Sequence, residues 1–297
     1  MQIESLKVFC DVVETGSFST AARMNHVTQS AVSQQIRALE TRYMQRLLSR
    51  SARAAVPTPV GAKLYRASKD ILQSFASLET VMREESNEIA GEVTLSTIYS
   101  VGLHELAPYL KAILRRYPKV NVRLNYRRSD VVVDEVLGDR AHLGIIAYPA
   151  NRPGLQVLPF RSDEMVLVTA KDHPLVCKRN VKLSDLEGMR FIGFERDIPT
   201  GKAIDRTLRK AGVQVQLAME MDNIETIKRA VELGMGVSVL PKATVQGEEL
   251  NGTLITRPFS DQNLTRPIGL LRRKGRFLER AAGALLDILS QGRPQKP

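Results

Sequence analysis

The sequence predicts an α/β protein in three parts: an N-terminal winged helix-turn-helix, one long helix, and a two-lobed α/β domain. Three observations predict it. Short apolar stripes of helical spacing occupy the N-terminal segment, a heptad pattern follows, and strand and helix patterns then alternate toward the C-terminus. The chain has 297 residues, 43% of them hydrophobic and 25% charged, which is an ordinary globular composition. This length leaves room for roughly two or three domains.

The first two helices follow from apolar spacing and from residues that begin and end helices. A stripe that includes Leu6 and Phe9 ends at Gly16, a residue typical of helix C-termini. Ser19 is the expected N-cap of the next helix, and Thr28 is the expected N-cap of a third. These segments predict a tri-helical core that contains a helix-turn-helix.

The third helix carries two unlike faces. Val32, Ile36 and Leu39 recur at i, i+4 and i+7 and form its apolar face. The other face offers hydroxyl, amide and guanidinium groups, which hydrogen-bond to base edges and phosphates in a major groove. A merely solvated helix face is the alternative, because polar faces are the norm on amphipathic helices. The expected DNA-binding surface, called the recognition face below, consists of Thr28, Gln29, Ser30, Ser33, Gln34 and Arg37.

A basic segment follows the third helix. Four arginines lie between residues 42 and 53, and the prolines Pro57 and Pro59, which come next, are expected to exclude helix. The pattern predicts a short β wing. We expect Arg50 and Arg53 to contact DNA phosphates, which adds affinity without sequence specificity. A solvated surface is the alternative for these arginines.

A longer pattern extends across this region. Its residues are Leu6, Phe9, Gly16-Ser17-Phe18, Ala21-Ala22, Thr28-Gln29-Ser30-Ala31-Val32-Ser33, Ile36, Leu39-Glu40, Leu47, Arg50, Thr58 and Gly61. With this spacing the region resembles the LysR-type transcriptional regulators. The sequence departs from the family pattern at Ser30, where proline is usual, and at Tyr43 and Met44, where Leu-Gly is common. With Met44 in place of glycine, the sequence does not predict the backbone conformation at the end of the third helix, because glycine is the residue that favours the left-handed conformation there.

The long helix is predicted from about residue 59 to 88. Its heptad seam consists of Leu64, Ile71, Phe75, Leu78 and Met82. The expected partner is a second copy of the chain, because a long exposed apolar seam is otherwise a liability; packing within the monomer is the alternative. The LysR resemblance implies a dimerising linker here, a homotetramer built as a dimer of dimers, and an interrupted palindrome of double-stranded DNA as the operator. RNA polymerase is a further candidate partner.

Beyond a hinge near residues 88–91, strands alternate with helices. Strands are expected at 93–96, 120–124, 143–147, 165–170, 191–193, 217–221, 237–240 and 268–271, and helices at 102–116, 131–137, 201–210, 224–233 and 277–289. The βαβα order predicts parallel sheets with helices on both faces.

Two lobes in this order resemble the periplasmic-binding-protein fold, which the LysR resemblance implies for an effector domain. The expected domains are 1–58 (winged helix-turn-helix), 59–88 (linker helix) and 93–297 (effector domain), with one lobe at about 93–162 and 267–297 and the other at about 163–266.

Polar side chains follow several of these strands. Ligands of open α/β sheets bind beyond the carboxyl ends of the strands, and helix N-termini favour anions there. The positions match those that line the inducer cleft in the LysR family, and we expect a small carboxylate or other oxyanion. Plain helix capping is the alternative for each hydroxyl. The expected effector-binding residues are Thr97, Tyr99, Ser100, Arg128, Ser129, Tyr148, Thr200 and Asn223.

Several function classes find no support in the sequence. No nucleophile elbow, phosphate loop, dinucleotide fingerprint or metal-ligand spacing is visible, so we expect no enzyme activity, no metal and no cofactor. The N-terminus does not resemble a signal peptide and no apolar run approaches the length of a membrane span, so we expect a cytoplasmic location and no membrane partner. Cys10 and Cys177 are expected as free thiols, with a redox role for either left open.

The net charge of +11 permits a polyanionic partner without identifying one. The expected function is therefore a sequence-specific transcriptional regulator controlled by a small anionic effector. A solute-binding module is the competing class, but such a module would not need the first 59 residues.

Overall fold

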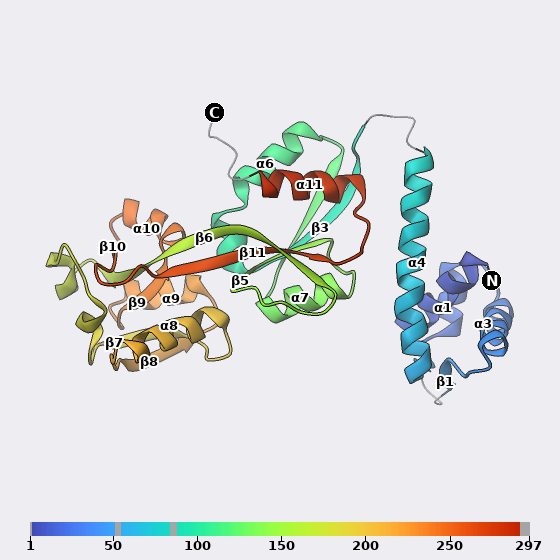
Figure 1. The fold of residues 1–297 in the computed structure, drawn as a ribbon, viewed down its shortest axis with the longest axis horizontal. Coiled ribbons are helices and arrows are strands. Elements are labelled where there is room, and N and C mark those ends of the chain that lie inside the picture. The colour runs from blue at the N-terminus through green and yellow to red at the C-terminus, as the bar shows by residue number, and fades with distance from the viewer. Residues whose placement is uncertain (1, 51–54, 84–87, 292–297) are drawn as a thin grey trace. The chain divides into compact units, whose positions relative to one another are not determined.

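A computed structural model describes residues 2–50, 55–83 and 88–291, which belong to two compact units, 1–87 and 88–297 (Figure 1). The first unit begins with helices α1 (Ile3–Thr15), α2 (Phe18–Met24) and α3 (Gln29–Tyr43). Together they enclose a small apolar core. The predicted tri-helical head is confirmed.

The helix ends follow local chemistry. Gly16 ends α1 in the left-handed conformation, with φ of 64°. The prediction of Ser19 as the cap of α2 was wrong, because Ser17 has the extended backbone of an N-cap and its hydroxyl accepts the Thr20 N–H at 3.3 Å. Met44 ends α3 with φ of 49°, so it adopts the left-handed conformation that the family usually assigns to glycine.

Strands β1 (Leu48–Arg50) and β2 (Ala55–Pro57) pair in antiparallel fashion and form the wing. Helix α4 (Pro59–Arg83) then begins at the second proline. The expectation that Pro59 excludes helix was wrong, because a proline in the first turn gives up an N–H that has no helical partner there. Gly61 is required at this junction, since a Cβ on it would lie 1.9 Å from the Leu47 carbonyl oxygen.

The apolar seam of α4 is divided between two environments. Leu64 of the seam packs against the core of the head, as does Leu72 beside the seam, whereas Ile71, Phe75 and Leu78 are 45%, 39% and 55% exposed. The α4 side chains beyond Leu78, Met82 included, lie outside the described residues. The monomer therefore uses the first part of the seam and leaves Ile71, Phe75 and Leu78 uncovered.

A polar contact adds to the packing of α4 on α1. Glu14 accepts hydrogen bonds from the Tyr65 hydroxyl at 2.8 Å and from Lys69 at 2.9 Å. Burial alone would raise the pKa of Glu14, but these bonds outweigh it and hold that pKa below its usual range.

The second unit contains a seven-stranded mixed sheet and a small two-stranded sheet. Its strands are β3 (Gly91–Thr97), β4 (Val120–Tyr126), β5 (Leu143–Ala147), β6 (Leu155–Ala170), β7 (Arg190–Phe194), β8 (Gln216–Met221), β9 (Ser238–Pro241), β10 (Leu254–Arg257) and β11 (Thr265–Arg273). The large sheet has the order β10-β6-β11-β5-β3-β4, with β9 also paired to β6, and β7 pairs with β8. The pairs β3/β4, β3/β5 and β7/β8 are parallel, which confirms the parallel arrangement predicted from the βαβα order. The pairs made by the long strands β6 and β11 are antiparallel, so the large sheet as a whole is mixed.

Two lobes share the long strands β6 and β11 (Figure 1). Lobe I contains strands β3–β5 and four helices, α5 (Tyr99–His104), α6 (Ala107–Arg116), α7 (Ser129–Leu137) and α11 (Arg280–Ser290). Lobe II contains strands β7–β10 and three α-helices, α8 (Pro199–Lys210), α9 (Ile224–Glu232) and α10 (Gln246–Leu250). It also contains the short helices η1 (Pro174–Cys177), η2 (Leu183–Leu186) and η3 (Lys242–Thr244). In lobe I, α6 and α11 pack on one face of the sheet and α7 on the other. Each lobe has its own apolar core.

Two element predictions need correction. The helix expected at 102–116 is divided into α5 and α6, because Pro108 lacks an N–H and its ring would clash with the carbonyl of His104 in a continuous helix. Strand β6 begins at Leu155, well before the predicted residue 165. The first half was not predicted because the polar residues 161–164 interrupt the apolar pattern of the strand. Strand β10 and helix α10 were not predicted.

Candidate functional site

Helix α3 presents the recognition face to solvent. Thr28, Gln29, Ser30, Gln34 and Arg37 are exposed and Ser33 is half-buried. The Thr28 hydroxyl accepts the Ala31 N–H at 3.2 Å, so Thr28 caps α3 as predicted. The opposite face is fixed inside the head, where Val32, Ile36 and Leu39 are at most 2% exposed. The six side chains are therefore held together on one rigid, outward surface.

The wing supplies the other predicted DNA contacts. Arg50 is the last residue of β1, and the structure describes its backbone but not its side chain. Arg53 lies outside the described residues. Glu40 accepts the N–H groups of Leu47 and Leu48 at 2.9 and 3.3 Å, which fixes the start of the wing against α3.

A cavity of about 340 Å³ lies between the lobes, at the carboxyl ends of the lobe I strands. Seven of the eight predicted effector residues line it, namely Tyr99, Ser100, Arg128, Ser129, Tyr148, Thr200 and Asn223. The exception is Thr97, which is fully buried with its methyl group packed toward Gly102 of α5. The rule that ligand sites follow strand ends thus brings seven distant residues to one place.

Three helices begin at this cavity without a side-chain cap. The N-cap residues of α5, α7 and α8 are Ile98, Arg128 and Ile198, each lines the cavity, and none accepts a backbone N–H through its side chain. The free N–H groups of a helix N-terminus and its dipole favour an anion. By contrast α9 is capped, because the Asn223 side chain accepts the Thr226 N–H at 3.1 Å.

Sequence reasoning missed Arg266, a cavity residue that is 1% exposed. Its guanidinium donates to the Asp163 carboxylate at 2.6 and 3.0 Å and to the Ser100 hydroxyl at 3.2 Å. Since Ser100 accepts this bond, its own O–H hydrogen remains to be donated. No local pattern could have identified Arg266, which lies on β11, 166 positions from Ser100.

Asp163 also joins a wider buried network. Arg161 donates to Asp163 at 3.0 Å and forms an ion pair with Glu105, which is 3% exposed. Asp163 and Arg266 face each other in register on β6 and β11, the two strands that both lobes share. The network therefore connects the cavity to the crossing between the lobes.

A cross-lobe ion pair lies at the edge of the cavity. Arg128 of lobe I donates to Glu195 at 2.8 Å and to Asp197 at 2.5 Å, both of lobe II. The bond to Glu195 in particular raises the pKa of Arg128. Arg128 is therefore engaged with two carboxylates, and an anionic ligand would have to compete with them for it. Lys202 and Arg152, which were not predicted, also line the cavity and are exposed.

Tyr148 follows strand β5 directly and lines the cavity. Its backbone has φ of 50°, an uncommon conformation for a bulky residue. Its hydroxyl donates to the Thr265 carbonyl at 3.3 Å, and burial raises its pKa. The ring therefore serves as a fixed wall of the cavity.

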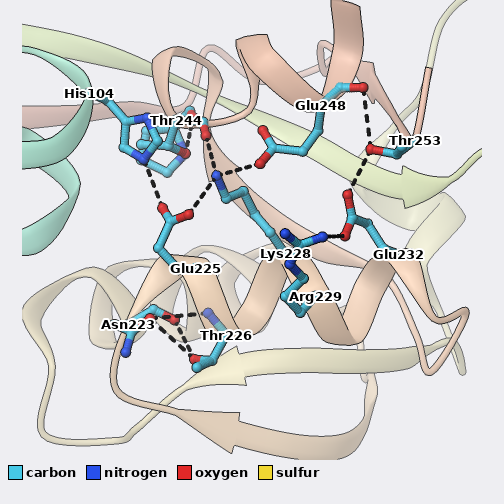
Figure 2. Close-up of polar contacts among 11 residues, drawn as sticks. His104, Asn223, Glu225, Thr226, Lys228, Arg229, Glu232, Thr244, Glu248 and Thr253 are labelled. Carbon is cyan, nitrogen blue, oxygen red and sulfur yellow. Dashed lines mark hydrogen bonds and ion pairs between the residues drawn. The ribbon is translucent and has the colours of Figure 1, made fainter. Parts of the chain in front are cut away.

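A second polar cluster joins the lobes outside the cavity (Figure 2). His104 of α5 contacts Glu225 of α9 at 2.7 Å, and Lys228 bonds to the other oxygen of Glu225 at 2.9 Å. Burial would raise the pKa of Glu225, but the bonds from His104 and Lys228 hold it below its usual range.

The two cysteines lie in different environments. Cys10 is buried and burial raises its pKa to about 12, so its thiol stays protonated, whereas Cys177 is exposed. The described residues hold no group of three or more His, Cys, Asp or Glu side chains suited to a metal ion. Within that same part of the chain, no helix has the length and apolarity needed to cross a membrane.

Family comparisons match both units. Residues 3–62 match the model described as "Bacterial regulatory helix-turn-helix protein, lysR family", and residues 86–293 match the model described as "LysR substrate binding domain". The HTH-type transcriptional regulator CysL of Bacillus subtilis is 26% identical, over 91% of both chains.

Solved structures show the same fold over nearly the whole chain. A full-length OxyR variant from Pseudomonas aeruginosa has a TM-score of 0.77 at 21% identity, covering 98% of both chains. Full-length CbnR, solved in complex with its target DNA, has a TM-score of 0.61 at 20% identity, covering 98% of this chain and 99% of that one.

Proposed function

The chain belongs to the LysR family of bacterial transcriptional regulators, which are DNA-binding proteins and not enzymes. From this premise we propose a function for each of its parts. Residues 1–58 bind the operator, 59–88 dimerise the chain, and 93–297 bind a small anionic effector. The observation that carries the DNA-binding proposal is the outward recognition face of α3, fixed by a buried apolar face.

In this proposal Gln29, Ser30, Ser33, Gln34 and Arg37 contact base edges in the major groove. Arg and Gln offer bidentate donors and acceptors that match guanine and adenine edges. Thr28 contributes at the N-terminus of α3, and Arg50 and Arg53 bind phosphates.

The uncovered part of the α4 seam supports dimerisation. Ile71, Phe75 and Leu78 present a row of exposed apolar side chains that a second α4 would cover. Two heads in a dimer meet two half-sites on one face of the duplex, which a palindrome provides. We extend this to a homotetramer on an interrupted palindrome. We also propose that RNA polymerase is the partner at the promoter and that the protein acts in the cytoplasm.

Three uncapped helix N-termini and the Ser100 hydroxyl support an anionic effector in the interlobe cavity. Seven predicted residues line that cavity, whereas Thr97 is buried and does not line it. An effector that binds both lobes shifts their arrangement, provided that its affinity differs between two assembly states.

The DNA proposal is tested by genome-wide mapping of the DNA bound to the full-length protein. We expect enrichment of interrupted palindromes beside promoters, with neighbouring genes that indicate the metabolite class. Binding to a recovered site will weaken steeply with salt, because bound arginines release counterions from phosphates. Absence of any enriched motif, or binding that is indifferent to salt, would refute it.

The effector proposal is tested by calorimetry of the full-length protein against small carboxylates, phosphate, sulfate and small amines. We expect binding among the anions only. Thr200→Val will lower the affinity of the best anion about 10-fold, because it removes a buried hydroxyl at the α8 N-terminus.

The matched control is Thr207→Val on the same helix, whose hydroxyl donates to the Ala203 carbonyl. It should leave the affinity unchanged. Binding of cationic ligands alone would contradict an anionic effector.

A further inference from the structure

The contact between His104 and Glu225 ties two helices that belong to different lobes. His104 is the last residue of α5 in lobe I, and Glu225 lies in the first turn of α9 in lobe II. Figure 2 shows the imidazole pointing at the Glu225 carboxylate. The distance between Nε2 of His104 and Oε1 of Glu225 is 2.7 Å. Their side chains are 22% and 44% exposed, so the contact is partly shielded from water.

Lobe II holds Glu225 in place through Lys228. The Lys228 side chain is 4% exposed, and its ammonium bonds to Glu225 at 2.9 Å, to Glu248 at 2.7 Å and to the Thr244 carbonyl at 3.0 Å (Figure 2). The cluster thus combines one cation with two carboxylates. Its surplus negative charge faces His104, where a proton on the imidazole would neutralise it.

The other charged or titratable groups on the elements around α5 contact partners other than His104 or are exposed to solvent. Helix α5 packs against α6, β4 and η3. On η3, Lys242 contacts Glu164 at 3.4 Å, and directly after α5, Glu105 pairs with Arg161. From β4, Tyr126 stacks on Tyr99. On α6, Lys111 is exposed and Tyr109 packs against Phe160. Of the described residues, Glu225 is the carboxylate in hydrogen-bond contact with His104.

Both helices also carry cavity residues, at the opposite end of α5 from His104 and directly beside Glu225 at the start of α9. Tyr99 and Ser100 begin α5, Asn223 caps α9 and Ile224 begins it, and all four line the cavity. A change in the contact between His104 and Glu225 therefore moves cavity residues of both lobes relative to one another.

We propose that His104 and Glu225 form a proton-dependent latch between the lobes. With His104 protonated, the charge-assisted bond to Glu225 holds α5 against α9 and keeps the cavity walls together. Loss of that proton removes the opposite charge and weakens the latch, so the lobes separate more readily as the pH rises. The inference rests on the proposed effector site and assigns it a regulation, but it needs no effector for its test.

The test measures the distance between the lobes in the full-length protein by pulsed electron spin resonance. One spin label attaches to Cys177 of lobe II, which is exposed while Cys10 is buried, and the other attaches to Asp287→Cys on α11 of lobe I. Labelled chains are diluted with unlabelled ones so that distances within one chain dominate. The measurements are made at about pH 5.5 and about pH 8.5, which bracket the usual titration of histidine.

We expect a narrow distance distribution at the lower pH and a broader one at the higher pH. His104→Gln and, independently, Glu225→Gln will give the broader distribution at both pH values. His26→Gln, which removes an imidazole from the other unit, will behave as the unmodified protein. A distribution that does not change with pH, or a His104→Gln variant that keeps the pH response, would overturn the latch. Neither of these two outcomes would contradict the proposal of an anionic effector, because the measurement is made without a ligand.

Discussion

Replacing Arg37 by alanine will lower the affinity of the full-length protein for its operator by about 10- to 100-fold, and Gln34→Ala will have an effect of the same order. Both side chains are exposed on the recognition face and leave α3 on the side opposite its buried residues. Each can make a bidentate bond to a base edge, and the loss of one such bond costs about 1–3 kcal/mol of discrimination. Sequence preference should therefore relax at one base pair for each variant.

These variants should fold normally, because substitutions of exposed side chains change the free energy of unfolding by about 0.5 kcal/mol or less. Operator affinity is measured by fluorescence anisotropy at fixed salt, with circular dichroism as the check on folding. The matched control is Arg66→Ala on α4, an exposed arginine that bonds to the Ala62 carbonyl of its own helix. If both recognition-face variants bind as tightly as the unmodified protein, the recognition face has been assigned wrongly.

Local patterns could predict the head because its determinants are short-range. The i, i+4, i+7 spacing of Val32, Ile36 and Leu39 fixed which side of α3 is buried, and that side is indeed closed. The misplaced cap shows the limit of such patterns, since Ser17 and Ser19 are equally good capping residues by type. Backbone geometry decides between them, and it depends on where Gly16 ends the preceding helix.

The cavity was partly predictable for a different reason. Ser100 and Arg128 come shortly after the ends of β3 and β4, and Thr200 lies in the first turn of the helix that follows β7, so the topology of an open α/β fold was enough to bring them together. Arg266 and Asp163 follow no such rule. They lie on two long strands that cross between the lobes, and the partnership depends on a register that spans 103 positions.

The contacts between the lobes could not be predicted for the same reason, because they join residues that are far apart in the sequence. His104 and Glu225 are 121 positions apart, and no local pattern marks either residue as the partner of the other. Arg128 was expected to contact an effector, but in the structure its guanidinium donates hydrogen bonds to the carboxylates of Glu195 and Asp197. Sequence patterns can thus indicate which elements approach one another, whereas the particular ionic partners emerge only from the packed structure.

The buried pair of Arg266 and Asp163 should matter most for stability. Arg266→Met will lower the free energy of unfolding of the α/β unit by about 3 kcal/mol, because it leaves a buried carboxylate without one of its two arginines. The Asp163 side chain is 1% exposed, so water cannot replace the lost bonds. The loss should be near the lower end of the range for broken buried pairs, since Arg161 still donates to Asp163.

The measurement is hydrogen exchange of the β6 and β11 amides in the full-length protein under increasing urea, because local protection separates this unit from the head. The matched control is Arg128→Met, which removes an arginine from two carboxylates rather than one, but the Arg128 side chain is 39% exposed. That loss should be about 1 kcal/mol or less. The double variant Arg266→Met/Asp163→Asn should recover part of the lost stability, because the carboxylate left behind is then uncharged. Equal effects of Arg266→Met and Arg128→Met would contradict this account, since the difference in burial predicts that the pair at the crossing strands contributes more than the pair at the cavity edge.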